Sequence, residues 1–192
     1  MTFKLIITIL LAIALPCLTK PADVAIEGDA CKNFKSCYSC LSQGPCSWCV
    51  NKAKCTKDTC GNDNIIFPGH IRALMAGSQF CPRVALPEKK LTIRNGKAES
   101  IVVKITQIYM YMVFTPWKCK FNFDGNEIVT NGMLLSDEVF CEPVTLNTDS
   151  SKAYTNGSVS VLWEYSKAFD GSLPFTVCRC DLDPSCVACN EE

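Results

Sequence analysis

Cysteine is the residue type in this sequence with the greatest potential for chemistry. The chain has 15 cysteines, and eight of them lie between Cys31 and Cys81. Cysteines packed this densely form disulfides, ligate zinc as thiolates, or act as a redox pair. One spacing occurs twice, as Cys31-x5-Cys37-x2-Cys40 and again near the C-terminus as Cys180-x5-Cys186-x2-Cys189.

The N-terminus favours the disulfide reading. Lys4 precedes an apolar run from Leu5 to Leu15, and Pro16 then leads into small and polar residues. This order is typical of a secretory signal peptide, predicted here over residues 1–22. A membrane anchor is the disfavoured alternative, because a bilayer span needs about 20 apolar residues. The mature chain is therefore predicted to be secreted and extracellular, without membrane insertion.

Zinc binding is the main competing use of the cysteines. Two CxxC pairs, Cys37-x2-Cys40 and Cys46-x2-Cys49, could together ligate one tetrahedral ion. Loss of the signal peptide would remove Cys17 and leave an even number of cysteines, as full pairing requires. A thioredoxin-like redox centre is disfavoured, since the surrounding sequence lacks alternating strands and helices. We therefore predict disulfides, with no metal and no cofactor.

Other candidates for chemistry are few. His70 is the single histidine and lies in a Pro-Gly loop, so a nucleophilic triad would have to use it. The sequence predicts no enzyme. Lysine plus arginine and aspartate plus glutamate both number 19, which gives no electrostatic case for nucleic acid. Lys89-Lys90 is interpreted as a solvated linker.

One modification motif is present. Asn156-Gly157-Ser158 is the only N-x-[ST] sequon, and it lies between predicted strands beside turn residues. For a secreted chain we predict a glycan on Asn156, the alternative being an unmodified Asn-Gly turn.

Most of the cysteines, and the sequon, lie in two segments of different composition. The segment Cys31–Cys81 is poor in long apolar runs, so it cannot build a large core and depends on crosslinks worth about 2–4 kcal/mol each. From Pro82 to Val177, short apolar or alternating runs separated by turns predict an antiparallel β-sandwich of seven or so strands. Asn95-Gly96 predicts a hairpin or turn. The predicted strands are 91–93, 101–105, 118–123, 127–130, 138–141, 159–165 and 173–178, with a further buried strand at 108–114.

The cysteine-dense segment resembles a known family. Cys31-x5-Cys37-x2-Cys40, the Cys46-Ser47-Trp48-Cys49 core, Cys55, Cys60 and Cys81-Pro82 are similar to the PSI domain of plexins, semaphorins and integrins. The resemblance implies a small disulfide knot with Trp48 in its core. It also implies the pairs Cys31–Cys46, Cys37–Cys81, Cys40–Cys55 and Cys49–Cys60.

The rest of the chain also resembles plexins. Lys118-Cys119-Lys120-Phe121 and Val139-Phe140-Cys141 are similar to the plexin immunoglobulin-like IPT/TIG domain, which implies a Cys119–Cys141 bridge between neighbouring strands. The tail resembles the start of a second PSI domain, with chance recurrence as the alternative. Its cysteines are expected to pair locally, in an order that the sequence leaves open: Cys178, Cys180, Cys186 and Cys189.

Together these patterns predict a small disulfide-rich PSI knot plus an all-β immunoglobulin-like (IPT/TIG) sandwich. The predicted divisions are a signal peptide (1–22), a PSI domain (23–82), an IPT/TIG-like sandwich (83–177) and a cysteine-rich tail (178–192). The resemblance implies an extracellular protein–protein interaction module whose partner is a plexin, a semaphorin or another cell-surface receptor. The alternative is a structural spacer, or a fragment of a larger plexin-like receptor, with no affinity of its own.

Overall fold

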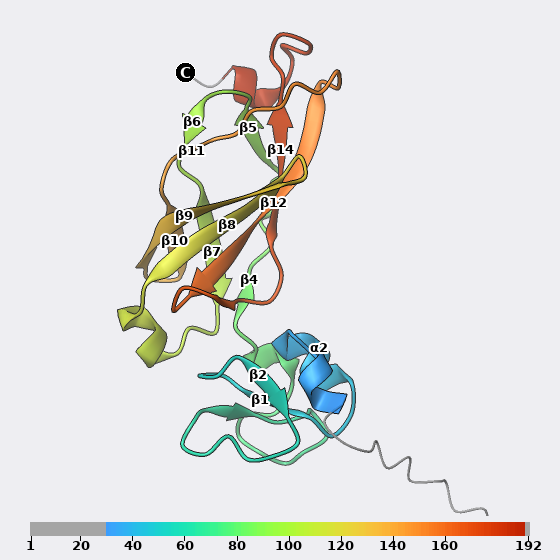
Figure 1. Cartoon of the computed structure of the whole chain (residues 1–192), viewed down its shortest axis with the longest axis vertical. Helices are drawn as coiled ribbons and strands as arrows, with labels where there is room; N and C mark the ends of the chain where they lie inside the picture. The colour runs from blue at the N-terminus through green and yellow to red at the C-terminus, as the bar shows by residue number, and fades with distance from the viewer. Residues whose placement is uncertain (1–29, 191–192) are drawn as a thin grey trace, which may run out of the picture. The chain divides into compact units, whose positions relative to one another are not determined.

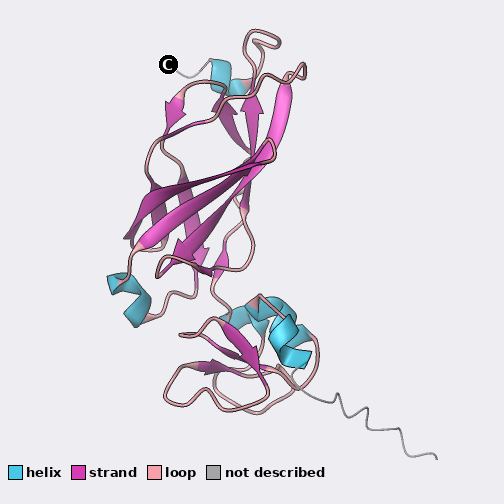
Figure 2. Ribbon diagram, viewed as in Figure 1, coloured by secondary structure: helices cyan, strands magenta, loops and turns pink. Residues whose placement is uncertain are grey.

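The computed structural model describes residues 30–190. The predicted signal peptide lies outside these residues. The chain from Cys31 onward forms one compact unit. Within the described residues, no helix combines the length and apolarity needed to span a membrane. Strands dominate, and the helices are short (Figure 2).

The cysteine-dense segment, defined as residues 31–81, contains only short elements. Its three small strands pair in the order β2-β1-β3. Ser36 caps the N-terminus of α2, and its Oγ accepts a hydrogen bond from Ser39 N at 3.2 Å. A helix of six residues is marginal by itself, so tertiary contacts and crosslinks must hold it. The elements are η1 Ala30–Asn33, α2 Cys37–Ser42, β1 Ser47–Cys49, β2 Lys54–Thr56, β3 Ile65–Ile66 and η2 Ser78–Phe80.

The β-domain, defined as residues 83–178, is built mainly from one 9-stranded sheet (Figure 1). The strand order is β4-β7-β10-β9-β8-β12-β14-β5, with β13 paired to β12, while β6 and β11 form a separate pair. The all-β, sandwich-like fold class is confirmed. The elements, with the tail helix η4, are β4 Arg83–Val84, β5 Leu91–Arg94, β6 Ala98–Glu99, β7 Val102–Thr106, η3 Met110–Phe114, β8 Trp117–Phe123, β9 Asn126–Leu135, β10 Glu138–Cys141, β11 Val144–Thr145, β12 Tyr154–Trp163, β13 Lys167–Ala168, β14 Leu173–Cys178 and η4 Val187–Cys189.

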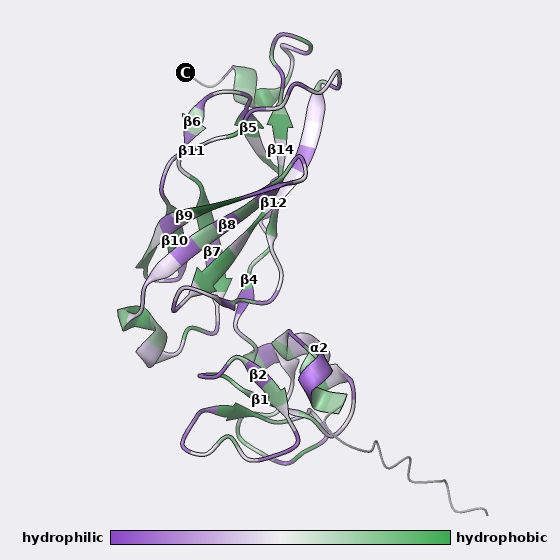
Figure 3. Cartoon of the chain, viewed as in Figure 1, coloured by the Kyte–Doolittle hydropathy of each residue, from purple (hydrophilic) through white to green (hydrophobic). Residues whose placement is uncertain are grey.

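Alternating side chains explain why the central strands form. Along β8, the odd-numbered residues from Trp117 to Phe123 are buried, whereas Lys118, Lys120 and Asn122 are half-buried or exposed. Because successive side chains in a strand point to opposite faces, this pattern places one face on the core and the other toward solvent. Figure 3 shows the resulting mixture of hydrophobic and hydrophilic residues along β8.

The turns follow their sequence signals in one case and differ in another. Asp124 and Gly125 both have positive φ, 49° and 76°, and connect β8 to β9 in a tight hairpin. Asn95-Gly96 also forms a turn, but it makes no hairpin, because the preceding β5 pairs in parallel with β14.

The predicted strand at 108–114 is wrong. Residues 110–114 of this run form the 3-10 helix η3, in which Met112 is buried while Met110 and Phe114 are 76% and 84% exposed. Gln107 has a φ of 60° and turns the chain away from β7. A continuous apolar run carries no period of its own, so it does not distinguish a strand from a connection with exposed apolar side chains.

Candidate functional site

Disulfides make up the framework of the cysteine-dense segment. α2 contributes Cys37 and Cys40, which reach Cys81 beyond η2 and Cys55 on β2. The other two pairs have sequence separations of 15 and 11 residues. The structure joins Cys31 to Cys46, Cys37 to Cys81, Cys40 to Cys55 and Cys49 to Cys60. All eight cysteines are buried.

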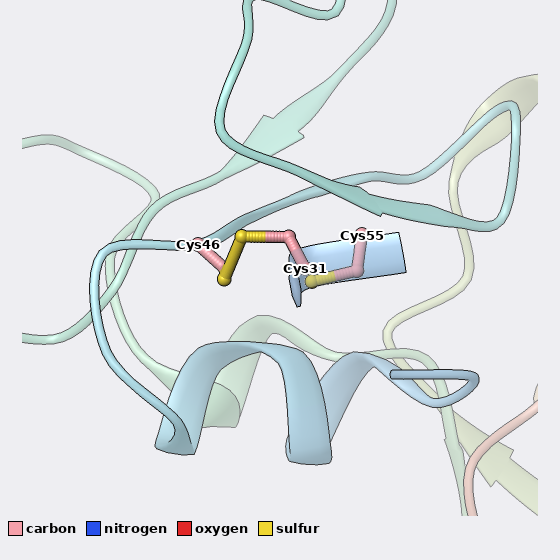
Figure 4. Close-up of side chains that lie close together, drawn as sticks. All are labelled: Cys31, Cys46 and Cys55. Atoms are coloured by element: carbon pink, nitrogen blue, oxygen red, sulfur yellow. A yellow bond between two sulfur atoms is a disulfide. The ribbon is translucent and has the colours of Figure 1, made fainter. Parts of the chain in front are cut away.

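Among residues 30–190, these sulfurs take part in two clusters of donor atoms spaced closely enough for a metal ion. In one, the sulfurs of Cys31, Cys46 and Cys55 lie within 4.8 Å of one another (Figure 4). In the other, Cys37 and Cys81 lie beside a carboxylate oxygen of Asp170. Zinc binds the thiolate form of cysteine, and in the structure each of these sulfurs is instead covalently bonded to another sulfur. The donor set in this state does not fit a zinc ion.

Trp48 occupies the centre of this segment. It pairs in register with Cys55 on β2 and with Ile66 on β3, and it is only 4% exposed. Its prediction as a core residue is confirmed. The tryptophan therefore packs in the core of the cysteine-dense segment.

The Cys119–Cys141 bridge differs in one respect from the geometry that the resemblance implies. Cys119 lies on β8 and Cys141 on β10, and β9 lies between these two strands in the sheet. The joined strands are therefore not neighbours. In a flat sheet, strands two apart are separated by about 9.5 Å, whereas the two Cα atoms here are 5.7 Å apart.

Gly132 of β9 explains how the bridge fits. It is paired with Trp117 on one side and with Cys141 on the other, at the point where the sheet folds. A Cβ atom at this position would lie 3.0 Å from Val139 Cγ1 and 3.4 Å from Cys119 Sγ. Because Gly132 has no side chain, the disulfide can cross β9 at this position. The disulfide then joins β8 to β10 and stabilises the bend in the sheet.

The tail is crosslinked onto itself at the end of β14. The structure pairs Cys178 with Cys186 and Cys180 with Cys189. Cys178, Cys186 and Ala188 form a small buried cluster of their own. The four cysteines therefore close a local cap that contacts β5.

Asp170 ties the cysteine-dense segment to the β-domain. Its carboxylate accepts hydrogen bonds from the backbone N–H groups of Cys37, at 3.0 Å, and Tyr38, at 2.6 Å, in the first turn of α2. Its own backbone N–H donates to Pro82 O, and its carbonyl accepts from Val84 N, both at 2.9 Å. Burial raises the pKa of this carboxyl, and the two N–H donors oppose the shift.

Further contacts connect the cysteine-dense segment to the β-domain at this joint. The Lys167 ammonium donates to the carbonyl of Asn51 and lies 4.7 Å from the centre of the Trp163 ring. Buried residues of the cysteine-dense segment and the β-domain belong to one hydrophobic cluster. The two parts are therefore joined by polar contacts and by a shared core.

An exposed apolar strip lies on the outer face of the sheet. We define it as Val102 on β7, Phe140 on β10, and Met133 and Leu135 on β9. Phe140 is half-buried and lies directly between Val102 and Met133 in the register. Met133 is 58% exposed, and Val102 and Leu135 are similarly open. Contiguous exposed apolar side chains indicate an interaction surface more strongly than isolated ones do.

Charged residues form a rim beside the strip. Lys104 Nζ lies 3.3 Å from the carboxylate of Asp137, and the lysine lowers the pKa of that carboxyl. Glu138 pairs in register with both Lys104 and Leu135. An apolar centre with a polar rim is the usual composition of a protein–protein interface.

The remaining predicted residues lie apart from this strip. His70 is exposed in a loop of the cysteine-dense segment. Asn156 is also exposed, but it lies within β12 and pairs with Thr176 of β14. The predicted position of the sequon beside a turn is therefore wrong.

Sequence reasoning missed three features of the site: Asp170, Gly132 and the apolar strip. An isolated glycine within a strand pattern signals a close approach, and this could have identified Gly132. Asp170-Gly171 carries only a turn signal. Its role as an acceptor for α2 depends on residues 133 positions earlier, which no local pattern shows.

Parts of this chain are similar to known proteins in sequence or in fold. Residues 30–67 match the family model for the plexin repeat, PSI. No curated protein matches the chain in sequence. Two structures of the plexin A4 full extracellular region match in fold at 17% sequence identity, over 78% of this chain, with TM-scores of 0.61 (domains 1 to 8) and 0.60 (domains 1 to 10).

The matched part is small in those structures. The chain spans 15% and 13% of their respective lengths. The likeness therefore concerns the fold of one stretch of a long ectodomain. Seven disulfides among the described residues are consistent with an extracellular, oxidising environment. The chain is thus plexin-like in fold, with a plexin repeat followed by an all-β domain.

Proposed function

We propose that this protein is secreted and acts as a soluble protein–protein interaction module of plexin or semaphorin type, modulating a cell-surface receptor. The observation that carries the proposal is the exposed apolar strip on the outer face of the sheet. Its partner is an extracellular protein, for which a plexin or semaphorin ectodomain is the first candidate.

The joint supports this function through preorganisation. Asp170 and Lys167 connect the cysteine-dense segment to the β-domain, and the disulfides limit the motion of the short elements. Binding by a surface that is already ordered loses little conformational entropy. A small module can therefore bind with an apolar strip of only a few side chains.

The test is binding of the secreted, disulfide-intact protein to a panel of plexin and semaphorin ectodomains. The variant Met133→Lys places a charge in the middle of the strip, and it should weaken binding by about tenfold or more, as loss of an interface hot spot does. Leu182→Lys is the matched control, because Leu182 is similarly exposed in the tail. This control should bind like the unchanged protein.

Two results would count against the proposal. If both variants weakened binding equally, the apolar strip would not be the binding surface. Absence of binding across the panel would favour the alternative, a structural spacer within a plexin-like stalk.

A further inference from the structure

A second surface feature lies on a different part of the β-domain. It is a groove of about 600 Å³ between the irregular segment 85–90 and the neighbouring strands β12 and β14. The volume lies in the range of small-ligand pockets, about 300–1,000 Å³. We define the groove by its argued residues: Leu86, Lys89, Lys90, Asn156, Pro174 and Thr176.

The groove contains the asparagine of the sequon. Asn156 and Ser158 alternate with Gly157 along β12, so both lie on the same outer face of the sheet. Gly157 faces the other way, where an added Cβ atom would lie 2.4 Å from the Phe175 ring. The two sequon residues needed for glycosylation are therefore presented together, although they lie within a strand.

Thr176 fixes the orientation of the Asn156 side chain. Its Oγ1 donates a hydrogen bond of 2.9 Å to Asn156 Oδ1, and Thr176 itself is buried. With Oδ1 held by Thr176, the amide nitrogen Nδ2 is the other polar atom of this exposed side chain. This nitrogen is the atom that carries an N-linked sugar.

The walls of the groove match the chemistry of a sugar. Leu86 is 75% exposed, and Pro174, which pairs in register with Ser158, is also exposed. The C–H face of a pyranose ring is apolar, so packing against these side chains removes apolar surface from water. Lys89 and Lys90 are exposed ammonium donors at the same groove, and sugar hydroxyls are suitable acceptors.

We infer that the groove is the seat of the protein's own N-glycan, with the first N-acetylglucosamine on Asn156 packed against Leu86 and Pro174. The glycan then covers this side of the β-domain and leaves the apolar strip on β7, β9 and β10 open. The inference rests on the secretory route that the proposed function includes.

The experiment uses the full chain secreted from eukaryotic cells. Intact mass should show a glycan on the unchanged protein and on Ser158→Thr, which keeps the sequon, but not on Ser158→Ala. After trimming to a single N-acetylglucosamine, NMR should show contacts between the sugar and the Leu86 methyl groups. Hydrogen exchange at the amide of Leu86 should be several-fold slower in the trimmed protein than in Ser158→Ala.

Leu86→Ser tests the packing itself. This variant should remain glycosylated and folded, because Leu86 is exposed, but it should lose the slowed exchange at residue 86. Unmodified Asn156 in the secreted protein, or a glycan without contacts to Leu86, would overturn the inference. Neither result would affect receptor binding through Met133, so failure of this inference and failure of the proposed function are separable.

Discussion

The cysteine-dense segment and the β-domain reach a folded state by different means. The first has four disulfides, strands of two or three residues and a buried set made largely of cysteines. The second has a long continuous sheet, one disulfide within it, and buried aromatic residues such as Phe121 and Phe175. Crosslinks mainly restrict the unfolded chain, whereas the aromatic core stabilises the folded one.

The difference shows what each region can tolerate. A segment with little apolar surface to bury loses most of its stability when a crosslink is removed. A sheet with a packed core should retain its fold without its disulfide. The joint at Asp170 connects the two regions, because this carboxylate of the β-domain accepts hydrogen bonds from the backbone of a crosslinked helix.

The largest effect is expected from removing the longest crosslink of the cysteine-dense segment. The double variant Cys37→Ser, Cys81→Ser opens a loop with a sequence separation of 44 residues. We expect a loss of about 2–4 kcal/mol, enough to unfold this segment while the β-domain remains folded. Denaturant unfolding with limited proteolysis measures both effects.

The matched control for this variant is Cys119→Ser, Cys141→Ser, with a separation of 22 residues. Its β-domain should lose stability and still resist proteolysis. If both double variants left the cysteine-dense segment equally protected, the contrast between the two regions would be wrong. Peptide mapping without reduction checks the pairing of all fourteen described cysteines.

The next effect concerns the disulfide of the β-domain. Gly132→Ala adds a Cβ atom 3.0 Å from Val139 Cγ1 and 3.4 Å from Cys119 Sγ. Overpacking of this kind costs about 1–3 kcal/mol, and thermal unfolding measures it. Val129→Ala, at an exposed position of the same strand, is the control for the strand. If Gly132→Ala were as stable as the control, β9 would not require a residue without a side chain at this position.

Local patterns predicted the strands well where one face is buried. The segments 138–141 and 173–178 form strands with the predicted bounds. Strand β9 was predicted only over 127–130, because its exposed apolar residues, Met133 and Leu135, obscure the alternation. The prediction of a strand at 108–114 is wrong for a related reason, since the exposed apolar residues of this run show no strand or helix period.

The features that form the candidate site depend on long-range geometry. The apolar strip exists because β10 lies between β7 and β9, and the sequence does not give that order. Asp170 meets α2 only in the tertiary structure, because 133 positions separate it from Cys37. The plexin repeat was predictable, because its cysteine spacing and Trp48 are local signals.

Loss of the Asp170 carboxylate should have a smaller effect, confined to the joint. Asp170→Ala leaves the N–H groups of Cys37 and Tyr38 without this acceptor. We expect a cost of about 1–2 kcal/mol, since the site is partly open to water. Asp170→Asn retains an acceptor oxygen and should cost less. Hydrogen exchange at the amides of Cys37 and Tyr38 should accelerate in the alanine variant, and equal exchange in both variants would contradict this role.

The smallest effect is the pH dependence of the same contact. Because burial raises the pKa of Asp170 in the folded protein above its ordinary value of 3.8, the folded state binds this proton more tightly than the unfolded chain does. The contribution of Asp170 to stability is therefore full below pH 3.8 and is lost as pH rises through the folded pKa.

The contribution of Asp137 depends on pH in the opposite direction. Lys104 lowers the pKa of Asp137, so its contribution to stability is lost as pH falls. The free energy of unfolding, measured from pH 3 to pH 7, should thus favour the unchanged protein over Asp170→Asn most at the acidic end. For Asp137→Asn the same difference should be greatest at the neutral end, and parallel curves for all three proteins would show that neither carboxyl is coupled to folding.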